Sequence, residues 1–179
     1  MAEEKKEPWL NYLALTTVVL AVCATLSTLK GGGFSTRSVV AQAQASDQWA
    51  YYQSKSIKGY IYDIQRENLE LESKTLKGGA SKSLAGEYGK KIAAYKEKTD
   101  RYEKEKEEIK QKAEGLEKVR DEAAKHSGAF GLAAMFLQIA ILLSSIAALM
   151  KRKPFWFIGL AAGCVGLLYF FNGFFLFMK

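Results

Sequence analysis

The sequence is short of the side chains from which most active sites are built. Its 179 residues include one histidine, two cysteines and two prolines. With so few of these residues, the chain has few of the side chains that form metal centres, reactive-thiol sites and catalytic triads. Cys23 and Cys164 lie inside apolar stretches, where we expect them to be buried small hydrophobic residues. We predict no catalytic residues, no metal and no cofactor, and therefore not an enzyme.

Charge is also missing from three long stretches of the sequence. No Asp, Glu, Lys or Arg occurs in residues 8–29, 129–150 and 154–178. A helix needs about 20 apolar residues to cross about 30 Å of hydrocarbon, so each stretch is long enough. The first stretch carries Trp9 and Tyr12 near one end and the third begins with Phe155 and Trp156, which are aromatic residues of the kind found at headgroup level. The pattern predicts an all-α integral membrane protein with three transmembrane helices in the lipid bilayer.

The remaining segments are polar. We predict a short tail at residues 1–7, an extramembrane segment at residues 30–128 and a basic loop at residues 151–153. A cleavage-like sequence, Ala43-Gln44-Ala45, lies too far beyond the first apolar stretch for a signal peptide, which favours an uncleaved anchor.

The short basic segments predict an orientation. Lys5, Lys6 and the loop 151–153 fall on one side of the membrane, which the positive-inside rule makes cytoplasmic. The N-terminus is then cytoplasmic and the extramembrane segment periplasmic. Basic residues also flank the opposite ends of the spans, which leaves the reverse orientation open.

The extramembrane segment is predicted to be an antiparallel helical hairpin of the coiled-coil type. Its arms are residues 38–73 and 81–126, and its turn lies near residues 77–80, where Gly78 and Gly79 are adjacent. Apolar residues recur every seven positions in each arm, as expected of a packed seam. The first arm has Ala43, Ala50, Ile57, Ile64 and Leu71; the second has Tyr88, Tyr95, Tyr102, Ile109, Leu116 and Ala123.

Symmetric pairing about residue 78 would place Ile64 opposite Ile92 and Ile57 opposite Thr99. Such a thin hairpin buries little core, and further tyrosines leave apolar surface around its first arm. We expect self-association or a partner protein to cover this surface. The run of three glycines at residues 31–33 predicts a bend between the first span and the first arm.

The densest cluster of candidate interface residues lies in the first arm, within the sequence DQWAYYQSKSIK. One interpretation is a protein-docking surface, since aromatic and basic residues make anchor points at interfaces. The other is packing of Trp49 inside the hairpin, with Lys55 and Lys58 paired to acids such as Asp100 and Glu97. The candidate interface residues are Gln48, Trp49, Tyr52, Gln53, Lys55 and Lys58.

This motif also carries a resemblance. An N-terminal span, the pattern QWxxYQxKSIK, a charged helical segment and two closing spans resemble a bacterial membrane-protein family classed as a domain of unknown function. The resemblance covers nearly the whole chain and implies the topology and a bacterial inner-membrane location. It implies no activity.

The third span carries small residues at regular spacing. Gly159, Gly163, Gly166 and Gly173 are candidates for close helix packing in lipid. Two alternatives stay open at this point, packing against the chain's own first two spans or contact with another copy.

Two functions fit these features. The first is a structural or accessory membrane protein whose hairpin mediates protein–protein contact or oligomeric assembly, within a homo-oligomer or a larger membrane complex. The alternative is an oligomeric channel or transporter component whose pore is lined by Gln138, Ser144, Ser145 and Asn172. The mixed-sign charges of the hairpin argue against a nucleic-acid partner, and no small-molecule substrate is evident.

Overall fold

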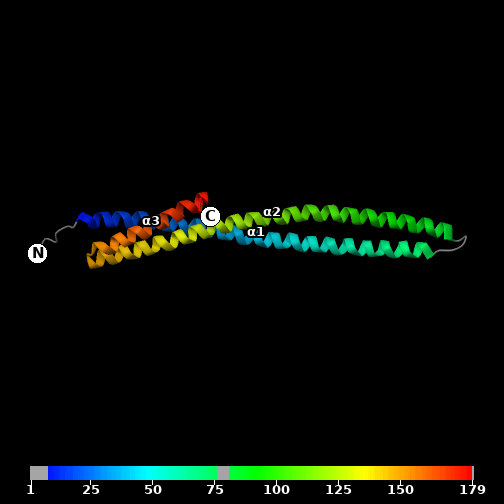
Figure 1. Ribbon diagram of the computed structural model, residues 1–179, viewed down its shortest axis with the longest axis horizontal. Helices are drawn as coiled ribbons and strands as arrows, with labels where there is room; N and C mark the ends of the chain where they lie inside the picture. Colours follow the sequence, from blue (N-terminus) through cyan, green and yellow to red (C-terminus); the bar gives the residue numbers. More distant parts are fainter. Residues whose placement is uncertain (1–7, 76–80, 179) are drawn as a thin grey trace. The chain divides into compact units, whose positions relative to one another are not determined.

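The computed structural model describes residues 8–75 and 81–178, and every regular element in these ranges is a helix (Figure 1). Helix α1 spans Pro8–Thr75, α2 spans Ser81–Met150 and α3 spans Lys153–Phe175. The prediction of an all-helical chain is confirmed for this part of the protein. The predicted tail at residues 1–7 and the predicted turn near residues 77–80 lie outside the described residues.

The three helices form two compact units. Unit 1 comprises Met1–Val40 and Val119–Lys179, and unit 2 comprises Ala41–Lys118. Helices α1 and α2 contribute to both units, whereas α3 belongs to unit 1 alone.

Unit 1 is packed with small and apolar side chains. Two clusters hold it together, one around Leu20, Leu137 and Ala140, the other around Trp9 and Ala147. Phe130 and Leu137 are among its fully buried side chains. Much of its outer surface is apolar as well, and all three helices are long and apolar enough to cross a membrane.

The predicted bend at residues 31–33 is wrong, because α1 continues through the three glycines as a helix. Gly31 is instead a point of close approach between α1 and α2. Its carbonyl oxygen accepts a hydrogen bond from Ser127 Oγ at 3.1 Å, and a Cβ atom on Gly31 would lie 3.1 Å from Phe130 Cβ. Small residues let helix backbones approach in this way.

Helices α2 and α3 are joined by a tight turn. Lys151 adopts the left-handed conformation that ends a helix, with φ of 51°, and Pro154 occupies the first turn of α3. At the other end of α3, Asn172 is buried and its Oδ1 accepts a hydrogen bond from the Met178 backbone N–H at 2.7 Å.

Unit 2 is an antiparallel pair of helices. Its direction follows from the contacts, since Trp49 of α1 meets Glu117 of α2 while Tyr62 meets Tyr95. The seam predicted for the second arm faces inward: Tyr88, Tyr95, Tyr102, Ile109 and Leu116 are buried or half-buried within this unit.

The seam predicted for the first arm is wrong. Its five residues, Ala43, Ala50, Ile57, Ile64 and Leu71, are all exposed. The face of α1 that meets α2 follows a different series with regular spacings of three and four residues, and we call it the inner seam. It consists of Ala41, Ala45, Gln48, Tyr52, Lys55, Gly59, Tyr62, Arg66, Leu69 and Ser73.

Candidate interaction surface

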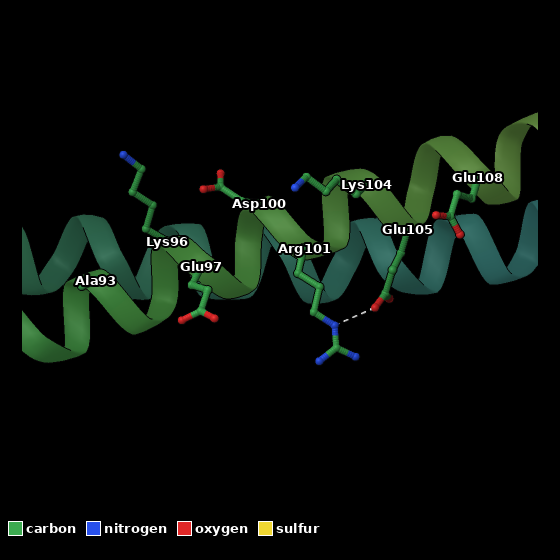
Figure 2. Close-up of a pocket in the computed structure, with 8 residues that line it drawn as sticks. All are labelled: Ala93, Lys96, Glu97, Asp100, Arg101, Lys104, Glu105 and Glu108. Carbon is green, nitrogen blue, oxygen red and sulfur yellow. Dashed lines mark hydrogen bonds and ion pairs between the residues drawn. The ribbon is translucent and has the colours of Figure 1, made fainter.

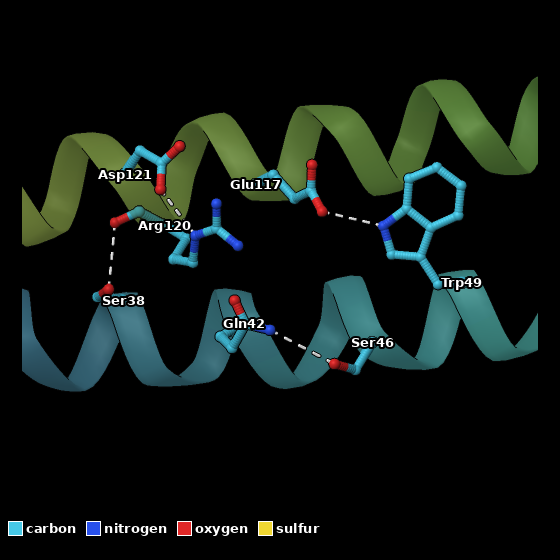
Figure 3. A network of polar contacts seen from close by, with 7 residues as sticks. All are labelled: Ser38, Gln42, Ser46, Trp49, Glu117, Arg120 and Asp121. Atoms are coloured by element: carbon cyan, nitrogen blue, oxygen red, sulfur yellow. Dashed lines mark hydrogen bonds and ion pairs between the residues drawn. The ribbon is translucent and has the colours of Figure 1, made fainter.

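The residues predicted as an interface divide between the two sides of α1. Gln48, Trp49, Tyr52 and Lys55 are half-buried against α2, whereas Gln53 and Lys58 are exposed. Trp49 Nε1 donates a hydrogen bond to Glu117 Oε1 at 3.0 Å, which Figure 3 shows reaching across between the helices. These positions explain how the cluster stabilises the helix pair, and its role as an interface stays a prediction.

Lys55 and Glu105 form an ion pair across the inner seam. Lys55 Nζ lies 2.6 Å from Glu105 Oε2, and Arg101 Nε lies 2.7 Å from Glu105 Oε1. The hydrogen bond from Lys55, followed by that from Arg101, lowers the pKa of the Glu105 carboxyl. The same contact with Glu105 raises the pKa of Lys55. The partner of Lys55 is therefore Glu105, not the Asp100 or Glu97 that the sequence suggested.

Lysines and tyrosines also meet across the inner seam. Lys106 of α2 is buried, forms an ion pair with Glu103 at 2.7 Å, and lies 5.5 Å from the ring centre of Tyr52. Lys98 similarly lies 4.7 Å from the ring centre of Tyr62. Cation–π contacts of this kind offset part of the cost of removing an ammonium group from water. Paired polar groups thus contribute to the packing of unit 2 beside its buried alanines and Ile109.

The outer faces of the two helices differ sharply. Opposite the inner seam, α1 presents an apolar residue at every seventh position, and we call this set the outer stripe. It consists of Ala43, Ala50, Ile57, Ile64 and Leu71. The equivalent positions of α2, farthest from its own inward residues, are all polar and exposed: Lys90, Glu97, Lys104, Gln111 and Lys118.

A shallow groove on α2 illustrates the polar character of that helix. It encloses about 590 Å³ and, apart from Ala93, is lined by charged side chains of both signs (Figure 2). Lys96 and Asp100 are among them, and the ion pair between Arg101 and Glu105 is drawn in the same view. Such a mixture of charges is typical of a solvated helix face and does not concentrate charge of either sign.

The candidate packing glycines of α3 lie against the chain's own helices. All four are buried, and an added Cβ atom would crowd neighbouring groups at each position. At Gly166 it would lie 2.8 Å from Leu137 Cγ, and at Gly163 it would lie 3.1 Å from Leu20 Cδ2. The glycines therefore bring α3 close to both α1 and α2 within unit 1.

The polar residues considered for a pore are scattered around unit 1. Ser144 and Asn172 are buried, whereas Gln138 and Ser145 are exposed on α2. Ser145 Oγ donates a hydrogen bond to the Ile141 backbone oxygen at 2.9 Å. Gln138 has no hydrogen bond to any of the described residues.

The described residues contain no group of three or more His, Cys, Asp or Glu side chains placed to hold a metal ion. The single histidine, His126, contacts other residues of unit 1. Its ring stacks on Phe34 with centroids 4.5 Å apart, and its Nδ1 lies 2.8 Å from the Gly173 backbone oxygen.

Within residues 8–75 and 81–178, these features define an all-helical structure with three helices that are long and apolar enough to cross a membrane. A sequence model of the family described as "Domain of unknown function (DUF4337)" matches residues 9–176, so the chain belongs to that family. No curated protein and no solved structure gave a significant match. The family match extends over nearly the whole chain and agrees with the resemblance inferred from its sequence.

Proposed function

We propose that this protein is a structural or accessory membrane protein whose helix pair mediates protein–protein contact or oligomeric assembly. The three apolar helices would anchor it in a bacterial inner membrane, with the N-terminus in the cytoplasm and the helix pair in the periplasm. It would act within a homo-oligomer or as a subunit of a larger membrane complex.

The observation that carries this proposal is the exposed apolar surface of unit 2. Ile57, Ile61 and Ile64 are more than half exposed, as are Tyr60 and Leu71. In unit 1, a bilayer accounts for exposed apolar side chains. Unit 2 is itself rich in charged residues, so lipid is a poor explanation there and a protein partner is a good one.

The position of Gln138 is a second observation that supports assembly, separate from the surface of unit 2. It lies exposed within the apolar part of α2 and lacks a hydrogen bond among the described residues. A polar side chain facing lipid without a partner is costly, and an interhelical hydrogen bond to another chain would satisfy it.

The alternative function is a pore built from several copies, and it would also use Gln138. Gln138 and Ser145 are exposed seven residues apart on α2, as residues lining a shared channel would be. The other two candidates, Ser144 and Asn172, are buried inside unit 1, which leaves a polar lining of two residues per copy.

The test is extraction of the full chain into nanodiscs, followed by measurement of its native mass and identification of co-migrating proteins. The proposal predicts either a mass of several chains or a stable companion protein. A particle containing one chain and no companion would contradict both the assembly and the pore. Ion flux through vesicles containing the purified oligomer would favour the pore over the scaffold.

A further inference from the structure

The outer stripe of α1 is the clearest unpartnered feature of unit 2. Ile57, Ile64 and Leu71 are 59%, 57% and 61% exposed, and Tyr60 and Ile61 widen the stripe at its centre. The position opposite a helix seam is normally the most solvated and the most polar. The equivalent positions of α2 obey this rule without exception, so the apolar character of the stripe is specific to α1.

The spacing of the stripe identifies the kind of surface that would cover it. A repeat of seven residues stays aligned only with another helix packed at a coiled-coil angle. The inner seam of α1 has the same period, so one supercoil accommodates both faces of this helix. The partner must therefore present a helix with its own seven-residue apolar repeat. A second copy of α1 supplies that helix with the same length and spacing.

We propose that two copies of this chain associate through their outer stripes, with the two α1 helices parallel and in register. This inference rests on the proposed function and specifies the partner. Its orientation follows from the anchoring, because α1 is one uninterrupted helix from Pro8 to Thr75 and begins with an apolar span. Two identical copies anchored in the same bilayer are equivalent, so we expect each residue of one α1 helix to face its counterpart in the other.

Parallel pairing produces favourable layers at the centre of the stripe. Ile57 meets Ile57 of the second copy, and Ile64 meets Ile64. On either side of each stripe residue, the residue three positions later in one copy faces the residue four positions later in the other copy. This places Tyr60 against Ile61 of the second copy.

The same geometry brings no two like charges together along the flanks. The remaining flanking pairs are Ser46 with Asp47, Gln53 with Ser54, Glu67 with Asn68 and Lys74 with Thr75. Each charged side chain therefore faces a neutral one that is able to form a hydrogen bond. A stripe of this composition fits a copy of itself in both apolar content and charge.

Disulfide cross-linking in intact membranes tests the pairing. In a chain whose own cysteines are removed (Cys23→Ala with Cys164→Ala), single cysteines are placed in the stripe as Ile57→Cys or Ile64→Cys. Mild oxidation should link each variant to itself and give a covalent dimer. Matched variants on the outer face of α2, Lys104→Cys and Gln111→Cys, should give several-fold less dimer. Equal yields on the two helices would overturn the proposal.

The register is tested by mixing the two stripe variants in one membrane. A parallel pair in register should give dimers of Ile57→Cys with itself and of Ile64→Cys with itself. Dimers that link Ile57→Cys to Ile64→Cys, formed in place of these, would show a pair that is shifted or antiparallel and overturn the parallel, in-register arrangement.

Native mass distinguishes failure of this inference from failure of the proposed function. A persistent oligomer or bound companion without stripe cross-links would overturn the stripe as the contact and leave the proposed function standing. A single chain without a companion would overturn both. The double variant Ile57→Glu/Ile64→Glu should lower the native mass to that of the unpaired chain while its helical circular dichroism signal stays unchanged.

Discussion

Units 1 and 2 contain parts of the same two helices, yet different kinds of side chain line their interiors. In unit 1 the buried positions hold glycine, alanine, leucine and phenylalanine, and polar groups such as Ser27 bond to their own helix backbone. In unit 2 the inner seam holds Tyr52, Lys55 and Arg66 alongside alanine and glycine. Ile57, Ile64 and Leu71 of that part of α1 lie on the outside instead.

Because of this difference, the exposed apolar side chains of the two units need separate explanations. Around unit 1 they fit a lipid environment, because the helices there are uncharged over lengths that match a bilayer. Around unit 2 they include the stripe residues Ile57, Ile64 and Leu71 of α1 at seven-residue intervals, with Tyr60 and Ile61 beside them, and Leu84 of α2 is exposed as well. A seven-residue spacing of apolar residues is typical of helices that pack against another helix.

The largest expected effect comes from filling space inside unit 1. Gly166→Ala should destabilise the protein by about 1–3 kcal/mol, because the new Cβ atom would lie 2.8 Å from Leu137 Cγ and 3.0 Å from the Leu137 backbone N. Gly131→Ala, whose Cβ atom would meet nothing within 4 Å, is the matched control. It should stabilise α2 by up to about 1 kcal/mol. Thermal unfolding in detergent measures both, and equal effects would show that α3 is not closely packed.

A smaller loss is expected from the polar interior of unit 2. Trp49→Phe removes the indole hydrogen bond to Glu117 and should cost about 1–2 kcal/mol, since hydrogen bonds to charged groups exceed the usual contribution. Glu117→Gln keeps an acceptor oxygen and should cost less. The measurement is the unfolding midpoint in denaturant, and an unchanged midpoint for Trp49→Phe would show that the bond contributes nothing.

The smallest expected effect is a pH dependence that belongs to unit 2. The pKa of Glu105 is lowered by Lys55 and Arg101, so its contribution is complete above the carboxyl's ordinary pKa of 4.5 and is lost as the pH falls through the lowered value. Glu105→Gln should therefore lower the midpoint at pH 7 and leave it nearly unchanged in acid, relative to the unaltered chain. Glu97→Gln, at an exposed position of α2, is the control. A difference between Glu105→Gln and the unaltered chain that does not shrink in acid would contradict the ion pair.

Much of the fold could be predicted from the sequence because charge is so unevenly distributed. The three apolar helices follow from the uncharged stretches. The inward face of the second arm was predictable as well, because charged residues flank its tyrosines and isoleucines at every turn. The predicted bend at residues 31–33 failed for a physical reason: Gly31 serves close packing against Phe130 while its helix continues.

The first arm could not be predicted by assigning apolar residues to the inside. Its inner seam includes polar groups with specific partners, such as Glu105 of α2 for Lys55 and the neighbouring Asp63 and Glu70 of α1 for Arg66. Symmetric pairing about residue 78 would have placed Lys55 opposite Arg101, whereas the observed partner is one helical turn further along. The regular three- and four-residue spacing from Ala41 to Ser73 was the signal in the sequence that would have identified this face.

The candidate interface residues were also difficult to assign from the sequence. Trp49, Tyr52 and Lys55 stand out in the sequence as a dense cluster, but their contacts are within the helix pair. The outer stripe is less conspicuous, since its members are single apolar residues separated by six others.

The most direct test of a covered outer stripe compares the accessibility of the two outer faces in intact membranes. Single cysteines at Ile57→Cys and Lys104→Cys, in the chain lacking Cys23 and Cys164, are reacted with a membrane-permeant maleimide. If a second copy covers the stripe, labelling is slow at position 57 and rapid at position 104. The difference should disappear when the Ile64→Glu substitution is added. Equally rapid labelling of both positions in the otherwise unaltered chain would contradict a covered outer stripe.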